Sequence, residues 1–414
     1  MTPGSLAPAA PPLEDYVGRG VHLYIDGEPY IDCASGTFNL SLGYSAPEVV
    51  QALHAQLDRC LHLSSDFTRR KSAEIFESLR EFLPEHIDAF WFRDIVGSTA
   101  NECAVRIAQK ATGRTDVISL FLSHHGQSAA ATGLSGNAFR QAGFALPFVG
   151  SVKVPAFDCA NCFYGQTRDR CDVLCARRIE DFITYASSGQ VAALIVEPVL
   201  GNGGNIVPDP RYFGIVREVC DRHGVLVIAD EVQTGFGRTG SFFASTGLAR
   251  DLKPDIITFA KGAGGIGIPV AGVVMRRELD VLEPWEHSST SGANPLALVA
   301  LEETIRYIRN NDVLGQVALT SKILKDGLHD LARHHPCVSQ VKGEGLMLAF
   351  DLPSGADVTR FISVARTHRL LLRGSRYGFG TTVKVRPPLI ISEAEAHEVV
   401  SGLRAALDDF EEGH

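Results

Sequence analysis

Apolar residues along this chain gather in short runs, and segments with helical spacing separate most of these runs. The runs are rich in Val, Ile, Leu and Ala and cover residues 117–122, 193–196, 225–229, 256–260 and 270–275. Uninterrupted apolar runs of this length are typical of strands buried on both faces of a parallel sheet. Their alternation with helices predicts an α/β fold, with a doubly wound sheet covered by helices on both faces.

The two ends of the chain follow other patterns. Residues 20–36 alternate apolar and polar positions around Asp26-Gly27, which predicts a β-hairpin. A helical pattern follows it, and the last part of the chain mixes strand and helix patterns. We expect an N-terminal arm with part of a small domain, a large domain and a C-terminal small domain, over residues 1–50, 51–305 and 306–414.

Composition narrows the classes of partner. The chain has 414 residues, a net charge of −9 and no long run of Lys or Arg, so we expect no nucleic-acid partner. No apolar run reaches the roughly 18–20 residues of a membrane span. The first residues show no secretory signal. The sequence therefore predicts a soluble, cytoplasmic protein that does not bind a membrane.

Polar and charged residues follow four of the apolar runs at the point where each run ends. His124, Glu197, Asp230 and Lys261 come directly after, or within a few residues of, the first four runs. Because ligands bind at the carboxyl ends of strands in open parallel sheets, we expect these side chains to form one site. The alternative is that each is a surface residue just past a strand.

Asp230 ends a buried run, and a carboxylate there is costly unless it meets a positive group. That group could be Lys261, as a salt bridge, or the protonated ring nitrogen of a cofactor. A lysine in a desolvated pocket can be neutral and form a Schiff base, and the small residues that follow Lys261 let a planar group approach. The pair therefore suits pyridoxal 5′-phosphate, whose ring nitrogen a carboxylate keeps protonated.

A candidate phosphate site precedes a helical pattern at residues 97–112. Gly97, Ser98 and Thr99 would supply free N–H groups and hydroxyls at the helix start, which bind a phosphate dianion well. The alternative is an ordinary helix N-cap.

These residues, taken together, resemble a known family. Residues 230–240, "DEVQTGFGRTG", with Lys261 thirty-one positions after Asp230, are similar to the class III (omega) aminotransferases. Residues 18–36, 42–53, 341–352 and 385–392 also resemble segments of that family. The resemblance implies the pyridoxal-phosphate fold type I, in which a mostly parallel seven-stranded sheet is sandwiched by helices and a smaller α+β domain comes from both termini.

The resemblance also implies an activity. The protein would be an aminotransferase of a specialised biosynthesis that moves an amino group from an amino acid or amine donor to a carbonyl acceptor by a ping-pong, Schiff-base mechanism. Lys261 would form the Schiff base and Asp230 would pair with the ring nitrogen. The remaining cofactor contacts would come from Gly97, Ser98, Thr99, His124, Glu197, Gln233 and, across a homodimer interface with shared active sites, Thr290. Arg238 would be structural.

Three positions depart from the family pattern. His124 stands where the family usually stacks an aromatic ring on the cofactor. Asn202 and Lys384 stand where members that use glutamate carry an acid and an arginine. Asn202 cannot neutralise a cation, and Lys384 cannot form the bidentate fork of an arginine with a carboxylate. We expect Arg386, two residues further on, to point away from Lys384.

The departures leave the reaction type open. A decarboxylase-transaminase like dialkylglycine decarboxylase, or an aminomutase, is the alternative to a simple aminotransferase. A protein that kept the fold only to interact with other proteins is a third hypothesis. Thr37 and Phe38 are expected on the substrate side with Asn202 and Lys384, and Phe67 and Tyr164 are weaker candidates.

Four cysteines lie close together in the sequence. Cys159, Cys162, Cys171 and Cys175 have the spacing C-x2-C-x8-C-x3-C. In a reducing compartment this pattern indicates a metal site for zinc or an iron–sulfur cluster. The alternative is an insertion loop with free thiols.

Overall fold

The computed structural model describes residues 15–143, 150–375 and 380–412, and these residues contain three β-sheets. The largest sheet has seven strands in the order β4-β10-β9-β8-β7-β5-β6. These strands are β4 (Ala89–Asp94), β5 (Asp116–Leu120), β6 (Ser151–Val154), β7 (Val191–Val196), β8 (Leu226–Asp230), β9 (Ile256–Phe259) and β10 (Ala271–Met275).

The order of these strands confirms the predicted doubly wound sheet. Strands β6, β5, β7, β8 and β9 pair in parallel, and β10 is antiparallel to both of its neighbours, β4 and β9. All five predicted runs are strands of this sheet, with ends that differ from the prediction by at most two residues. Strands β4 and β6 have no counterpart among the predicted runs.

Two hydrophobic layers cover the two faces of the sheet. Along β8, Ile228 packs with helix α4 (Gly97–Thr112) on one face, while Val227 and Ala229 pack in the larger core on the other face. This alternation follows from the two-residue period of a strand. Asp230 is two residues after Ile228, so the same period directs its carboxylate toward α4.

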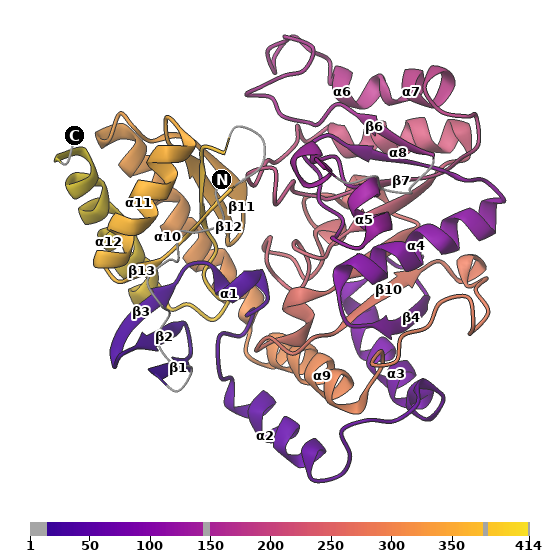
Figure 1. Ribbon diagram of the computed structural model, residues 1–414, viewed down its shortest axis with the longest axis horizontal. Coiled ribbons are helices and arrows are strands. Elements are labelled where there is room, and N and C mark those ends of the chain that lie inside the picture. Colours follow the sequence, from indigo (N-terminus) through magenta and orange to yellow (C-terminus); the bar gives the residue numbers. More distant parts are fainter. Residues whose placement is uncertain (1–14, 144–149, 376–379, 413–414) are drawn as a thin grey trace.

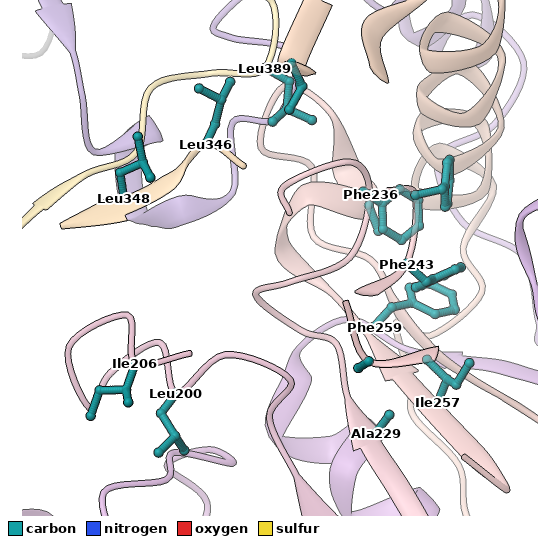
Figure 2. Close-up of a cluster of buried hydrophobic side chains, with 14 of the residues drawn as sticks. Leu200, Ile206, Ala229, Phe236, Phe243, Ile257, Phe259, Leu346, Leu348 and Leu389 are labelled. Carbon is teal, nitrogen blue, oxygen red and sulfur yellow. The ribbon is translucent and has the colours of Figure 1, made fainter. Parts of the chain in front are cut away.

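Aromatic side chains fill the core on the face away from α4. Figure 2 shows Phe236 and Phe243, from the loop after β8, beside Phe259 at the end of β9. The ring centroids of Phe236 and Phe259 are 5.5 Å apart, and all three side chains are at most 1% exposed. This packing fixes the loop that follows Asp230 against the end of β9, the strand that precedes Lys261.

Helices surround the seven-stranded sheet (Figure 1). Helix α8 packs beside β8, and α9 packs on α2 and α3. These helices are α2 (Pro47–Leu57), α3 (Ser65–Leu79), α5 (Ala129–Leu134), α6 (Leu174–Arg177), α7 (Ile179–Tyr185), α8 (Tyr212–His223) and α9 (Pro295–Asn310).

The two smaller sheets join the ends of the chain. One contains β1 (Tyr16–Arg19), β2 (His22–Ile25), β3 (Glu28–Asp32) and β13 (Leu370–Leu371), in that order, and β3 pairs with β13 in parallel. The predicted hairpin is confirmed, because Asp26 and Gly27 connect β2 and β3 with φ values of +53° and +81°. In Figure 1 these N-terminal strands lie beside the C-terminal helices.

The other small sheet has the strand order β11-β12-β15-β14. Its strands are β11 (Ser339–Glu344), β12 (Met347–Asp351), β14 (Arg373–Gly374) and β15 (Thr382–Val385), and the helices near it are α10 (Val313–His334), α11 (Gly355–Thr367) and α12 (Glu393–Glu412). Among the described residues, no helix is both long enough and apolar enough to cross a membrane. The predicted domain limits stay a prediction.

Candidate active site

Four neighbouring strands bring the predicted residues to one edge of the large sheet. His124, Glu197, Asp230 and Lys261 follow or end β5, β7, β8 and β9, which are adjacent and parallel. A cavity of about 370 Å³, here called the inner cavity, opens at this edge. Its lining includes Thr37, Gly97, Ser98, His124, His125 and Lys261.

Asp230 lies beneath the inner cavity and is 3% exposed. Its Oδ2 atom accepts hydrogen bonds from Asn101 Nδ2 at 2.8 Å and from His125 Nδ1 at 2.7 Å, and its Oδ1 atom accepts one from the Val232 N–H at 3.1 Å. Burial alone would raise the pKa of Asp230, but the hydrogen bond and charge of His125 outweigh it and hold this pKa below its usual value. The carboxylate is therefore ionised at neutral pH.

Asn101 and His125 both line the cavity and hold Asp230 from two elements. Asn101 is on α4, and its Oδ1 atom accepts a hydrogen bond from Thr258 Oγ1 at 2.6 Å. His125 is fully buried, and its Nε2 atom has no hydrogen-bond partner among the described residues. Since Nδ1 donates to Asp230, this network orients a carboxylate and an imidazole with respect to each other.

Lys261 follows β9 in a short 3-10 turn with a φ of +49°. Burial lowers the pKa of the Lys261 amine, while the charges of Asp230 and Glu197 oppose this effect. The lowered pKa increases the fraction of neutral amine, the form that attacks carbonyl carbons and accepts protons.

Glu197 is 2% exposed and holds the loops on either side of it. Its carboxylate accepts the His124 N–H at 2.8 Å and the Gly201 N–H at 3.0 Å. Burial and the charge of Asp230 raise the pKa of Glu197 to about 7.

His124 lines the inner cavity, where the sequence predicts a ring that contacts the cofactor. Its Nδ1 atom lies 3.3 Å from Asn137 Nδ2. Burial, followed by the charges of Lys261 and Arg140, lowers the pKa of His124 to about 3. The ring is therefore neutral at physiological pH and can stack without adding a charge beside Lys261.

The start of α4 forms one wall of the inner cavity. Gly97 is the first residue of the helix, and an added Cβ there would meet Val232 Cγ1 at 2.8 Å. Ser98 Oγ accepts the Gln127 N–H at 3.0 Å, and an added Cβ at Gly126 would lie 2.4 Å from the same oxygen. The two glycines therefore let Val232 and Ser98 pack closely in this wall, where the first N–H groups of the helix are free of helical partners.

Gln233 is held by Arg386. The Arg386 guanidinium donates to Gln233 Oε1 at 2.8 Å, to the Gly201 carbonyl at 3.0 Å and to Asn205 Oδ1. Arg386 is 1% exposed, and burial lowers its pKa well below the usual range. These contacts link the loop after β8 with the loop after β7.

The expectation that Arg386 points away from Lys384 is wrong. Positions i and i+2 of an extended segment share a face, because side chains alternate with a period of two. Both cations lie against the Phe38 ring, with Arg386 Cζ 4.2 Å and Lys384 Nζ 5.5 Å from its centroid.

The other predicted substrate residues line a second cavity of about 770 Å³, here called the outer cavity. Helix α1 (Ser35–Phe38) separates it from the inner cavity, since Thr37 lines the inner cavity and Phe38 lines the outer one. The outer lining includes Phe38, Arg140, Asn202, Arg373, Ser375 and Lys384.

Several sequence candidates lie away from both cavities. The Thr99 hydroxyl bonds the Val96 carbonyl at 3.1 Å, and Thr290 is exposed. Phe67 is 78% exposed at the start of α3, and Tyr164 lies within the cysteine segment, between Cys162 and Cys171. Arg238 is buried and donates to the carbonyls of residues 346 and 387, which agrees with the structural role expected for it.

The four clustered cysteines line one small cavity of about 20 Å³. All four are free thiols, and burial, followed by the neighbouring thiols, raises the pKa of Cys175 to about 12. No three of their sulfur atoms all lie within 4.8 Å of one another; among the described residues, the set that meets this distance is Asp94, Cys103 and His287. The thiols are neighbours without forming a closed ligand set.

The sequence interpretation did not assign three residues that the structure places in the site. His125 could have been found from its position after β5, beside His124. Asn101 lies one helical turn after Gly97, so the spacing of α4 offered a weak signal. Arg386 lies two residues after Lys384, and the two-residue period of an extended segment places both side chains on the same face.

Comparisons with known proteins agree with this geometry. The family model described as "Aminotransferase class-III" matches residues 16–407. A diaminobutyrate–2-oxoglutarate aminotransferase from Rhizobium meliloti is 32% identical over 93% of this chain and 85% of the relative. An acetylornithine aminotransferase from Mycolicibacterium smegmatis is 32% identical over 96% and 94%. The solved omega transaminase from Pseudomonas jessenii in complex with PMP superposes with a TM-score of 0.88, at 28% identity over 95% and 92% of the two chains.

Proposed function

The chain belongs to the class III aminotransferase family, and from this premise we propose that Lys261 and Asp230 are the catalytic residues of a pyridoxal 5′-phosphate-dependent transaminase. Such an enzyme moves an amino group from an amino acid or amine donor to a carbonyl acceptor. The supporting observation is that Lys261 lines the inner cavity together with Asn101 and His125, the two side chains that hold Asp230. The relatives quoted above are all aminotransferases or transaminases, which favours transamination over decarboxylation or an aminomutase reaction.

The residues around the inner cavity fit pyridoxal 5′-phosphate. Free N–H groups and the Ser98 hydroxyl at the start of α4 are the donors that a phosphate dianion needs. Gly97 and Ser98 would therefore hold the phosphate, Asp230 the ring nitrogen and Gln233 the ring oxygen.

Each of these residues contributes to the reaction through its charge state. When bound, the cofactor supplies an aldehyde that exchanges amino groups and a ring that accepts an electron pair. Asp230, ionised in its network, keeps a proton on the ring nitrogen and thereby strengthens that capacity. Lys261 would hold the cofactor, and its amine, once free and neutral, would take a proton from the donor's Cα atom and later return one.

His124 and Glu197 support this pair. The neutral His124 imidazole would pack against the cofactor ring, in the place where relatives carry an aromatic residue. Glu197 holds the His124 backbone and is a second acid near Lys261. Because its pKa is about 7, the Glu197 carboxyl is present in both its protonated and its ionised form near neutral pH.

We also propose that the enzyme is a homodimer with shared active sites. Thr290 is exposed and lies outside the inner cavity of its own chain, as expected of a residue that contacts the phosphate in a partner subunit. A dilution series followed by light scattering and activity tests this: activity should fall with the dimer fraction.

The proposed function is tested by the two half-reactions. Purified protein should be yellow, its absorbance should shift when an amino donor is added without an acceptor, and an oxoacid acceptor should reverse the shift. Steady-state rates at several acceptor concentrations should give the parallel double-reciprocal lines of a ping-pong mechanism. Release of carbon dioxide from every donor that shifts the absorbance would favour the decarboxylase instead.

The cysteine segment is a separate proposal. We propose that Cys159, Cys162, Cys171 and Cys175 close around one zinc ion, because four thiols already border a single ion-sized cavity. Elemental analysis should find one zinc per chain, and Cys171→Ser should lose it, while Cys60→Ser, outside the segment, should keep it. Protein purified without chelator that contains no zinc would contradict the proposal.

A further inference from the structure

Three side chains of the kinds that bind metal ions meet in the core beside α4. Asp94 ends β4, Cys103 is on α4, and His287 lies in the loop between β10 and α9. The three residues are 1%, 0% and 7% exposed. A carboxylate oxygen, the thiol sulfur and an imidazole nitrogen all lie within 4.8 Å of one another. Three elements therefore bring three different ligand atoms to one buried point.

The Asp94 carboxylate has few hydrogen-bond donors for a buried group. Its two oxygens share a single donor, His287 Nε2, at 3.0 Å and 3.1 Å, and no other donor within the described ranges reaches them. The Asp230 carboxylate, which is equally buried, accepts three hydrogen bonds. A buried carboxylate with so little compensation is costly, so a cation at this point would stabilise it.

Cys103 lies beside this carboxylate. A buried cysteine alone is an ordinary core residue, but here burial, followed by the charge of Asp94, raises the pKa of the Cys103 thiol well above its usual value. The charges of Arg93 and Arg106 also act on the thiol, yet both arginines donate to backbone carbonyls of the loop that carries His287. Neither arginine forms an ion pair with Asp94, so the protein's own cations leave the carboxylate uncompensated.

The three ligand atoms fit zinc better than magnesium or calcium. Zinc takes thiolate, imidazole and carboxylate ligands in a tetrahedron whose neighbouring ligand atoms lie about 3.5 Å apart. Magnesium and calcium prefer oxygen ligands alone. The contact between Asp94 and His287 is slightly shorter than the tetrahedral spacing, so small movements of the side chains would place all three atoms around one ion.

We propose that Asp94, Cys103 and His287 bind one zinc ion, which connects β4 and α4 to the loop between β10 and α9. The Cys103 thiol releases its proton to solvent as its sulfur binds the ion, and a water molecule takes the fourth position. Because this site has three protein ligands and the hydrogen bond between Asp94 and His287 must open, zinc binds here more weakly than to four thiols. The site therefore fills when zinc is added in excess.

The inference is independent of the transaminase assignment, and its test removes the cysteine segment as a competitor. Holoenzyme with Cys159→Ser and Cys171→Ser, here called the segment variant, is incubated with excess zinc chloride, desalted and analysed for metal. It should retain about one zinc per chain. Adding Cys103→Ala should abolish this binding. Adding Cys220→Ala instead is the matched control, because Cys220 is equally buried, on α8, and it should leave the binding intact.

Cobalt(II) gives a readout that a merely structural role would not change. Difference spectra against the cobalt-free segment variant should show the visible bands of tetrahedral cobalt and the charge-transfer band of a thiolate ligand. Cys103→Ala should remove the thiolate band. Asp94→Asn and His287→Gln, each made in the segment variant, should weaken the visible bands, and they test the site again if the Cys103 variant fails to fold.

Thermal unfolding gives a third measurement. Zinc that binds the folded protein should raise the unfolding temperature of the segment variant by mass action, and it should not do so once Cys103 is replaced. The site is overturned if the segment variant retains no zinc after loading, or if the Cys103→Ala and Cys220→Ala proteins retain or lose it equally. Loss of zinc and of the thiolate band in Cys103→Ala alone supports it.

Discussion

The buried charge beneath the inner cavity has partners of complementary character, whereas the buried Lys384 in the outer cavity has no acid on the described lining. Beneath the inner cavity, the Asp230 carboxylate is matched by His125, Asn101 and the Val232 N–H. In the outer cavity, Lys384 is buried beside Arg373 with no acid on the described lining. A completed network holds catalytic groups in one geometry without a ligand, whereas an unpaired buried charge lowers the stability of the fold around it.

Of the three departures from the family pattern, His124 lies at the inner cavity and the other two lie at the outer cavity. Asp230, Gln233 and Lys261 stand in the segments that resemble the class III aminotransferases. Asn202 and Lys384, which depart from the members that use glutamate, both line the outer cavity.

The largest effect is expected at the inner cavity. Lys261→Ala removes the amine proposed to bind the cofactor and to move the Cα proton, so amino transfer should fall by about 10³-fold or more. The donor-induced absorbance shift should disappear with it. Lys322→Ala, which removes an exposed lysine paired with Asp326, should keep both, and equal losses in the two variants would contradict the assignment.

A second variant tests whether the Asp230 network is catalytic or only structural. Asp230→Asn keeps the shape but removes the charge, so kcat should fall by roughly 10²-fold or more, and the protein should lose stability because His125 loses its ionised partner. The matched control is Asp255→Asn, in a second buried pair with Arg217 at 3.0 Å. It should cost similar stability, measured by thermal unfolding, but little kcat.

A smaller effect is expected when the outer cavity receives an acid. Asn202→Glu places a carboxylate on the wall that carries Lys384, where it would give the buried amine an ion-pair partner. The unfolding temperature should rise by about 2 °C. Asn202→Gln, which keeps the amide, should leave the unfolding temperature near that of the wild type; a rise of the same size would point to side-chain length instead of charge.

The smallest effect concerns the pH dependence of stability. The pKa of Glu197 is raised to about 7 in the folded protein, so its stabilising contribution is present below the unfolded value of about 4.5 and is lost as pH rises through 7. Glu197→Gln should remove this slope: between pH 5 and 7.5, its unfolding temperature should decline less than that of the wild type. Parallel declines in differential scanning fluorimetry would show that Glu197 titrates elsewhere.

Sequence patterns predicted the strands that are buried on both faces. Uninterrupted apolar runs mark β5, β7, β8, β9 and β10, because both faces of each strand contact the core. Strand β6, at the sheet edge, reads "SVKV" and is half-buried, so it carries no such run. The antiparallel direction of β10 is set by its connections and pairing, which an apolar run does not encode.

The candidate site was predictable where its residues follow strands and less so where it depends on distant contacts. The strand ends indicated Asp230 and Lys261 directly. Asn101 reaches Asp230 across 129 positions of sequence, and Arg386 reaches Gln233 across 153, so neither contact has a local pattern. The cysteine spacing predicted neighbours correctly, but spacing alone does not decide whether four sulfur atoms converge on one point.

The parallel pairing of β3 with β13 ties Ile31 to Leu370, near opposite ends of the chain. Phe38 lies just after the first of these strands and Arg373 just after the second. During translation, the wall that holds both residues cannot assemble until almost the whole polypeptide has left the ribosome. The strands that carry Asp230 and Lys261 are synthesised well before that point.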